Sequence, residues 1–136
     1  MDILSKERRS WNMSRIRGKN TVPERVVRSA LHRMGYRFRL HRPDLPGKPD
    51  IVLRRYNTVI LVHGCFWHRH KGCKFAYTPK SRKRFWKQKF ERNVQRDHQV
   101  KRLLKSRGWR VCVIWECETE SDKLLSRRLL EVLEPR

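Results

Sequence analysis

The sequence predicts a single α/β domain with a mixed central sheet flanked by helices. Its 136 residues match the size of one ordinary domain. Four short apolar or β-branched runs are interspersed with three stretches in which apolar residues recur at helical spacing. The resulting order, α-β-β-β-α-β-α, is typical of a mixed sheet covered by helices.

The first predicted helix begins at Thr21-Val-Pro-Glu24. Thr21 is a suitable N-cap, proline fits the first turn, and Glu24 completes a capping box. Apolar residues continue at helical spacing to Met34, and Gly35 ends the helix. Residues 36–40 then alternate apolar and basic side chains, which predicts a half-buried strand.

The remaining elements follow from similar signals. Residues 50–53 and 58–63 are β-branched runs joined by a polar turn at Tyr56-Asn57, and residues 64–80 form a loop rich in Cys, His and aromatic side chains. Residues 81–106 predict a long helix, interrupted near Asn93 and ended by Gly108. Residues 109–115 predict a buried strand, and residues 119–133 an amphipathic final helix.

The charge is strongly unbalanced. Lys and Arg number 35 against 13 Asp and Glu, a net charge of +22. Between Arg8 and Lys89 there are 23 basic residues and three acids, which are Glu24, Asp44 and Asp50. This balance favours a polyanionic partner, most simply nucleic acid. Within such a surface an acid repels phosphate unless a cation lies between them.

Several classes of protein are excluded. The hydrophobic content of 38% and five Trp are too high for a disordered basic tail. No run approaches the ~18 apolar residues of a membrane span, and the N-terminus lacks an apolar signal segment. We therefore expect a cytoplasmic protein whose four cysteines are reduced or metal-bound rather than paired.

Two regions are expected along the chain. Residues 1–20 are polar and basic with a few interspersed apolar side chains, and we expect an arm that orders on a partner. Residues 21–136 form the single folded domain.

A metal-binding cluster is predicted in the loop after residue 63. Three ligands at close spacing in this loop, with a fourth after the last strand, match the closed Cys3His shell of a structural zinc ion. The set is Cys65, His70, Cys73 and Cys117. His63 and His68 are alternative ligands, whereas Cys112 lies within a strand and is interpreted as a small buried apolar residue.

An acid and two histidines are candidates for catalysis. Asp50 begins one strand and His63 ends the next, which is the outline of the restriction-endonuclease superfamily, although the usual acid-x-Lys pair is absent. A carboxylate on a rigid strand can hold a hard cation. His68 is a candidate general base because an imidazole titrates near neutrality. Glu24 is favoured as a cap only.

Aromatic residues flanked by cations are candidates for insertion into DNA. Phe66 and Trp67 lie in the loop that the metal would hold, and Trp86 lies in a basic stretch. Such side chains can wedge into a base step, and a mismatched pair lowers the free energy of opening. Core packing is expected instead for Phe85, Phe90, Trp109 and Trp115.

Other polar residues have no predicted functional role. Asp44 is interpreted as a turn residue, and the surface is expected for His32, His41 and His98.

Taken together, these motifs resemble the very-short-patch mismatch repair endonucleases over about residues 10–120. The resemblance rests on these segments: Pro46-Gly-Lys-Pro-Asp50, His63-Gly-Cys-Phe-Trp-His68 with His70 and Cys73, Phe85-Trp86, Asn93-Val-Gln-Arg-Asp97, and Gly108-Trp-Arg-Val with Val-Ile-Trp-Glu-Cys117. It implies a restriction-endonuclease-like domain that nicks one strand of duplex DNA 5′ to the thymine of a T:G mismatch. Such mismatches arise when 5-methylcytosine is deaminated.

The resemblance also implies roles for particular residues. Asp50 and the main-chain carbonyl of Val62 would bind magnesium, and His68 would be the general base. His63 and Glu24 would position metal-bound water or phosphate, so that Glu24 is more than a cap. Structural zinc would be held by Cys65, His70, Cys73 and Cys117, and the wedge would be Phe66, Trp67 and Trp86.

The expected partner is double-stranded DNA carrying a T:G mismatch, bound by a monomer associated with the nucleoid, with mismatch-repair proteins as further candidates. Two alternatives remain at this point. One is a zinc-stabilised DNA-binding module without catalysis, and the other is a nuclease of the same fold that acts on branched DNA or RNA.

Overall fold

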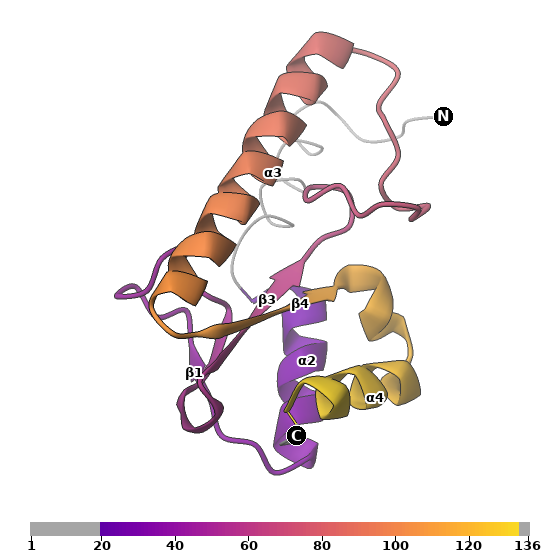
Figure 1. The fold of residues 1–136 in the computed structure, drawn as a ribbon. Helices are drawn as coiled ribbons and strands as arrows, with labels where there is room; N and C mark the ends of the chain where they lie inside the picture. The colour runs from indigo at the N-terminus through magenta and orange to yellow at the C-terminus, as the bar shows by residue number, and fades with distance from the viewer. Residues whose placement is uncertain (1–19, 134–136) are drawn as a thin grey trace.

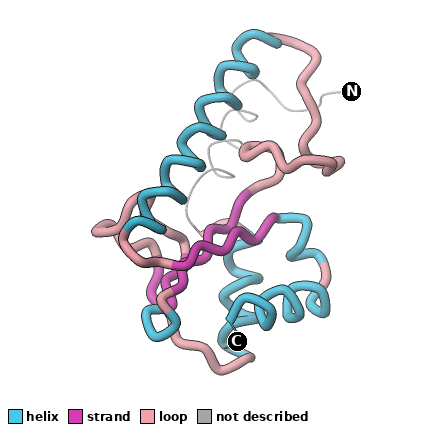
Figure 2. Tube along the Cα trace, in the orientation of Figure 1, coloured by secondary structure: helices cyan, strands magenta, loops and turns pink. Residues whose placement is uncertain are grey.

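The structure is a computed structural model that describes residues 20–133. Figure 1 shows the ribbon and Figure 2 the same view coloured by secondary structure. The predicted arm over residues 1–20 therefore lies almost wholly outside the described residues. No helix within residues 20–133 is long and apolar enough to cross a membrane.

The helices and strands appear in the predicted order. Their bounds are α2 (Val22–Arg33), β1 (Arg39–Leu40), β2 (Ile51–Leu53), β3 (Thr58–His63), α3 (Lys83–Ser106), β4 (Arg110–Trp115) and α4 (Asp122–Leu133), with short 3-10 turns at η1 (Arg54–Tyr56) and η2 (Glu116–Glu120). The prediction of an α/β fold with a mixed sheet is confirmed.

The four strands form one sheet in the order β1-β2-β3-β4. The pairs β1–β2 and β2–β3 are antiparallel, whereas β3 and β4 are parallel, with His63 opposite Trp115 at the end of the pair. The parallel pair requires a crossover, and α3 supplies it. As a result, β3 and β4 end at the same edge of the sheet, where the chain enters the loop after His63 on one strand and η2 on the other.

Helices cover both faces of the sheet. On one face Ile51, Ile60 and Ile114 pack with the apolar sides of α2 and α4. On the other, Val52 and Val59 pack with Leu104 near the end of α3. Successive strand residues alternate between these two layers, as the pleat requires. In Figure 1 the N-terminal half of α3 extends beyond the sheet, beside the loop that follows β3.

Four local predictions are corrected. The strand expected over residues 36–40 is limited to Arg39–Leu40. Helix α3 is continuous through Asn93, because its i to i−4 hydrogen bonds outweigh the low helix propensity of one residue. The final helix begins at Asp122 rather than residue 119, after the η2 turn.

The fourth correction concerns the capping box. The N–H of Glu24 donates to Thr21 Oγ1 at 3.4 Å, as predicted. The carboxylate of Glu24, however, accepts from the N–H of Asn20 rather than that of Thr21. Glu24 thus still caps the start of α2, but its side chain extends further from the helix than a capping box requires.

Candidate active site and metal-binding cluster

A cleft of about 1180 Å³ lies where α2, the end of β3 and the middle of α3 meet. All four residues predicted for catalysis line it, and so do Val62 and Trp67. The predicted residues in its wall are Glu24, Asp50, Val62, His63, Trp67 and His68. The predicted residues alone are up to 44 positions apart in the sequence, from residue 24 to residue 68, and the cleft also includes residues of α3.

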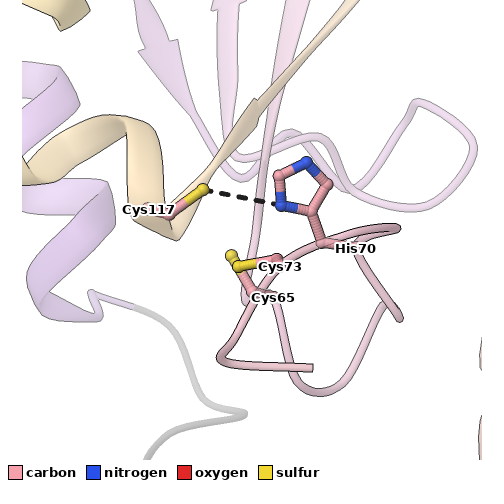
Figure 3. Close-up of side chains that lie close together, drawn as sticks. All are labelled: Cys65, His70, Cys73 and Cys117. Carbon is pink, nitrogen blue, oxygen red and sulfur yellow. Dashed lines mark hydrogen bonds between the residues drawn. The ribbon is translucent and has the colours of Figure 1, made fainter. Parts of the chain in front are cut away.

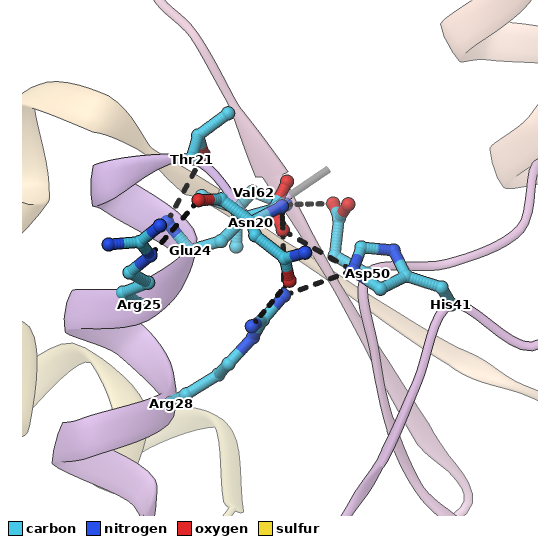
Figure 4. Close-up of polar contacts among 8 residues, drawn as sticks. All are labelled: Asn20, Thr21, Glu24, Arg25, Arg28, His41, Asp50 and Val62. Atoms are coloured by element: carbon cyan, nitrogen blue, oxygen red, sulfur yellow. Dashed lines mark hydrogen bonds and ion pairs between the residues drawn. The ribbon is translucent and has the colours of Figure 1, made fainter. Parts of the chain in front are cut away.

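Asp50 is anchored at the start of β2 by the neighbouring strand. Its Oδ2 accepts a 2.8 Å hydrogen bond from the N–H of Val62 (Figure 4). Burial raises the pKa of Asp50 to about 7, the Val62 hydrogen bond opposes this, and the nearby charge of Glu24 adds to it. A buried carboxylate of this kind is stabilised in its ionised form by an adjacent cation.

Glu24 extends from the first turn of α2 toward Asp50. It is only 4% exposed, and its Oε2 accepts from Arg28 at 2.9 Å and from the N–H of Asn20 at 3.0 Å. One ligand atom each from Glu24, His41 and Asp50 lies within 4.8 Å of the others. The two carboxylates at this separation are suitable ligands for a divalent cation, and His41 lies beside them.

His68 is paired with an acid from α3. Its Nδ1 lies 2.6 Å from Asp97 Oδ2, so the imidazole donates its Nδ1–H to the carboxylate. This tautomer leaves the lone pair on Nε2, which is the state that a general base requires. Asp97 also stabilises the positive charge that the imidazole acquires when it takes a proton.

His63 packs directly against His68. The two rings are stacked with centroids 3.8 Å apart, and burial together with the positive charge that His68 can carry lowers the pKa of His63 to about 3. His63 is therefore neutral at physiological pH. Among the described residues its Nδ1 is buried without a hydrogen-bond partner, which fits a site for a water molecule or a phosphate oxygen.

The second cluster contains the four predicted zinc ligands. One ligand atom each from Cys65, His70, Cys73 and Cys117 lies within 4.8 Å of the others. Figure 3 shows the four side chains grouped together. Sγ of Cys117 is 3.5 Å from Nδ1 of His70, whose ring stacks on Trp115. The alternative ligands His63 and His68 lie instead with Asp97 in the cleft.

The donor set of this cluster fits zinc. Three thiols and one imidazole form the closed shell typical of structural zinc. Burial raises the pKa of Cys65 to about 12, so that this thiol ionises readily only with a cation beside it. Cys112 lies elsewhere, 6% exposed in the core below α4, which confirms its interpretation as a small apolar residue.

The aromatic residues of the predicted wedge pack together beside the cleft. Phe66 lies 5.1 Å from Trp67 and 5.6 Å from Trp86, measured between ring centroids. Phe90 and the guanidinium of Arg69 complete the packing. Trp67, predicted as part of the wedge, is only 7% exposed because it packs within this cluster. Phe85, assigned to the core, is 42% exposed.

Two residues of the cleft were missed by sequence reasoning. Asp97 appeared only within a motif, although its position four residues after Asn93 places both on one face of α3, where Asn93 donates to the carbonyl of Trp67. His41, expected on the surface, has a side chain only 13% exposed against Glu24. No sequence signal identifies it, because its contacts depend on the pairing of β1 with β2. Asp44, by contrast, simply pairs with Arg42.

The fold and the cleft define a class of protein. A strongly basic α/β domain that brings two carboxylates and a carboxylate-supported imidazole into one cleft has the composition of a DNA-cleaving enzyme.

Comparison with known proteins identifies the family. Residues 1–74 match the family described as DNA mismatch endonuclease Vsr. The chain is 52% identical to the type II nicking enzyme V.XorIIP of Xanthomonas oryzae over 98% of both chains. It is 40% identical to the DNA mismatch endonuclease Vsr of Escherichia coli, over 98% of this chain and 85% of that protein. The chain belongs to the Vsr family of DNA mismatch endonucleases and is a DNA-cleaving enzyme.

Proposed function

We propose that this protein nicks one strand of duplex DNA on the 5′ side of the thymine in a T:G mismatch, in a magnesium-dependent reaction. The observation that carries this proposal is the joint presence in one cleft of the Asp50–Glu24 carboxylate pair and the His68–Asp97 pair. The names of the relatives support mismatch-directed nicking. The thymine-containing mismatch and the position of the nick come from the resemblance.

Magnesium would be held by Asp50 and by the main-chain carbonyl of Val62. The buried carboxylate of Asp50, with its raised pKa, fits a cation, as does the second carboxylate beside it. When bound, magnesium neutralises negative charge on the phosphate and on the leaving 3′-oxygen. Glu24 and His63 would orient the attacking water and the phosphate within the cleft.

His68 would act as the general base. Its Nε2 takes a proton from the attacking water while Asp97 holds the ring and stabilises the resulting imidazolium. His63, kept neutral by burial, can offer a hydrogen bond without adding a charge that would oppose protonation of His68. Cleavage of the P–O3′ bond then leaves a 3′-hydroxyl and a 5′-phosphate.

Recognition of the mismatch would depend on Phe66, Trp67 and Trp86. These rings form one cluster, and Trp67 directly precedes the proposed base His68. A weak base pair lowers the free energy needed to open the step into which an aromatic side chain inserts. Insertion and chemistry would thus involve adjacent residues of one loop.

Zinc would have a structural role in this loop. Its ligands would be Cys65, His70, Cys73 and Cys117, which join the loop after β3 to η2 after β4. By fixing these two chain segments, the ion would hold His68 and the aromatic cluster in place.

The proposal also covers the fold family, the domain bounds, and the location and partners of the protein. We assign the domain to the restriction-endonuclease-like folds, because an antiparallel β1–β2–β3 unit continues into a parallel β4 and bears an acid where β2 begins. Residues 1–20 would be a basic arm and residues 21–136 the enzyme domain. We also propose that it acts as a cytoplasmic, nucleoid-associated monomer, with mismatch-repair proteins as candidate partners.

A nicking assay tests this function. Duplexes of one sequence, carrying either a T:G mismatch or a matched pair, are incubated with the protein with and without added Mg²⁺, and the nick is mapped by denaturing electrophoresis. We expect one nick 5′ to the thymine only in the T:G duplex with Mg²⁺. Magnesium is omitted rather than chelated, because a chelator would also remove zinc.

The controls distinguish the alternatives. Asp50→Ala and His68→Ala should bind DNA but not nick it. Equal cutting of matched, mismatched and branched DNA would support the same-fold nuclease instead. Mismatch binding by the wild-type protein without any cleavage would support a non-catalytic module, against the family assignment.

A further inference from the structure

One buried and two largely buried side chains, Glu24, Arg28 and His41, form a chain of contacts beside the proposed magnesium site (Figure 4). Nη2 of Arg28 lies 2.9 Å from Oε2 of Glu24 and 3.0 Å from Nε2 of His41. Its Nη1 donates to Oδ1 of Asn20 at 2.8 Å. Both terminal nitrogens of Arg28 thus contact internal acceptors, which sets this residue apart from the exposed basic side chains available to DNA phosphates.

The chemistry of these groups determines which atom donates and which accepts in each contact. A guanidinium only donates hydrogen bonds, so Nε2 of His41 has to accept, and it carries a lone pair. An accepting Nε2 cannot also donate to Glu24, whose Oε2 lies 3.5 Å away. His41 therefore acts on Glu24 through Arg28 rather than directly.

The backbone of His41 is placed for this contact. The residue directly follows β1 and has a φ of +47°, a left-handed conformation that is uncommon outside glycine. Its N–H donates to the carbonyl of Asp50 at 3.3 Å. One residue is thus bound to the main chain of Asp50 while its ring contacts the guanidinium that holds Glu24.

Burial distinguishes this group from a surface ion pair. The side chains of Arg28, His41 and Glu24 are 16%, 13% and 6% exposed. An exposed i,i+4 pair would contribute little to helix stability, because water screens the two charges. Here the pair is largely removed from water, and the ligand atoms of Glu24 and Asp50 lie within 4.8 Å of one another.

We propose that His41 is a positioning residue that sets the affinity of the cleft for its divalent cation. It fixes Arg28, and Arg28 holds the carboxylate of Glu24 in place beside Asp50. This inference rests on the proposed function, in which Asp50 binds magnesium. Removing His41 leaves the guanidinium free to move, so that Glu24 no longer has one defined position toward the cation.

The test measures binding of Mn²⁺, which replaces Mg²⁺ as a probe. The concentration of free Mn²⁺ is measured from its electron paramagnetic resonance signal during titration of the zinc-loaded full chain. His41→Leu removes the acceptor nitrogen and should weaken Mn²⁺ binding about tenfold, as loss of an outer-shell partner typically does. His41→Gln retains an acceptor oxygen and should restore binding to within about twofold.

Two further measurements separate positioning from a loss of structure. His98→Leu, at an exposed site on α3, is the matched control and should leave binding unchanged. In nicking assays, His41→Leu should raise the Mg²⁺ concentration for half-maximal rate about tenfold with little change in kcat at saturating Mg²⁺. If His41→Leu lowers the thermal unfolding midpoint, the same measurements are made on His41→Ala. The alanine also removes the acceptor nitrogen, and its side chain is smaller than that of leucine.

The outcomes are distinguishable. Because His41 acts through Arg28, His41→Leu should cause no further loss of Mn²⁺ affinity in an Arg28→Met background. The inference would be overturned if His41→Leu lowered Mn²⁺ affinity as much in that background as in the wild type. It would also be overturned if His41→Leu alone left Mn²⁺ binding unchanged. Asp50→Asn tests the underlying site. Loss of Mn²⁺ binding in Asp50→Asn but not in His41→Leu refutes only the role of His41, whereas full binding by Asp50→Asn refutes the proposed magnesium site.

Discussion

At the scale of single residues, the cleft depends on hydrogen bonds that orient groups which would otherwise be mobile. Asp50 is held by the N–H of Val62 at 2.8 Å and His68 by Asp97 at 2.6 Å. Each of these bonds fixes the position of a side chain, and the bond to Asp97 also fixes the tautomer of the neutral His68 ring. Replacing one carboxylate oxygen by an amide nitrogen, as an Asp→Asn substitution does, should therefore change the chemistry of the cleft.

Asp97→Asn should reduce the nicking rate without weakening DNA binding. An amide at this position can still contact His68, but it cannot stabilise the imidazolium and permits the wrong tautomer. Loss of this support should lower kcat at least about 100-fold. Single-turnover nicking, compared with filter binding of the same duplex, measures the two effects. A similar loss in both would indicate that Asp97 serves folding or DNA contact instead.

Asp50→Asn should stabilise the protein in the absence of divalent cations. The pKa of Asp50 in the folded state is about 7, above its ordinary 3.8, so the folded protein holds a proton that the unfolded chain releases. Stability is therefore lost as pH rises from about 4 to 7 and stays reduced above that. The amide removes this penalty.

Thermal unfolding without added Mg²⁺ tests whether Asp50→Asn stabilises the protein and how this effect depends on pH. At pH 8 the Asp50→Asn substitution should raise the free energy of unfolding by at least about 1 kcal/mol, and the gain should shrink at pH 4.5. Added Mg²⁺ should stabilise only the wild type. A variant less stable than the wild type at pH 8 would contradict the raised pKa.

At the scale of elements, the loop between β3 and α3 has both a metal cluster and an aromatic cluster. The loop is joined to η2 by Cys117 and to α3 by Asn93 and Asp97. A further constraint comes from the turn before β2, where Gly47 has a φ of +72° and a Cβ would lie 2.5 Å from Val100 of α3. Helix α3 is thus packed against both segments that lead into the cleft.

Cys73→Ser should release zinc and destabilise the domain. The four ligands join the loop after β3 to η2 after β4, so that loss of the metal would remove this link between the two segments. We expect loss of one zinc per chain by elemental analysis and a decrease of at least about 2 kcal/mol in the free energy of unfolding. Cys112→Ala, in the core away from the cluster, is the matched control and should retain the zinc. Retention of zinc by Cys73→Ser would exclude this ligand.

Trp67→Ala should reduce discrimination more than affinity. The proposed wedge selects weak base pairs, so the ratio of nicking rates on T:G and matched duplexes should fall about tenfold or more, while binding of matched DNA changes little. Phe85→Ala, an exposed aromatic on α3, is the control and should keep the ratio. Equal losses of rate on both duplexes would argue against the wedge.

At the scale of the whole molecule, the chain has a net charge of +22, whereas its cleft contains acidic side chains. The positive surface attracts the DNA backbone over long distances, whereas the carboxylates at the centre require a cation before phosphate can approach. Association and catalysis thus have different electrostatic requirements.

DNA affinity should fall steeply with salt. If about six to ten phosphates are neutralised, affinity decreases by about 10³ to 10⁵ between roughly 50 and 200 mM salt. Fluorescence anisotropy with a matched duplex measures the slope, and the Asp50→Asn variant should share it because Asp50 contacts no phosphate without a cation. A flat dependence would show that binding is not driven by phosphate contacts.

Local patterns in the sequence determined the order of elements, the start of α2 at Thr21, the limits of β3 and the three cysteines of the metal-binding cluster. These features depend on neighbours in the chain or on ligand chemistry, and both are visible in a linear sequence. Only the tertiary structure decided that His70 rather than His63 or His68 joins the cysteines. It also decided that Asp97 supports His68, and that His41 is buried beside Glu24. These contacts arise from the crossover of α3 and the pairing of β1 with β2, which bring together residues that no local pattern connects.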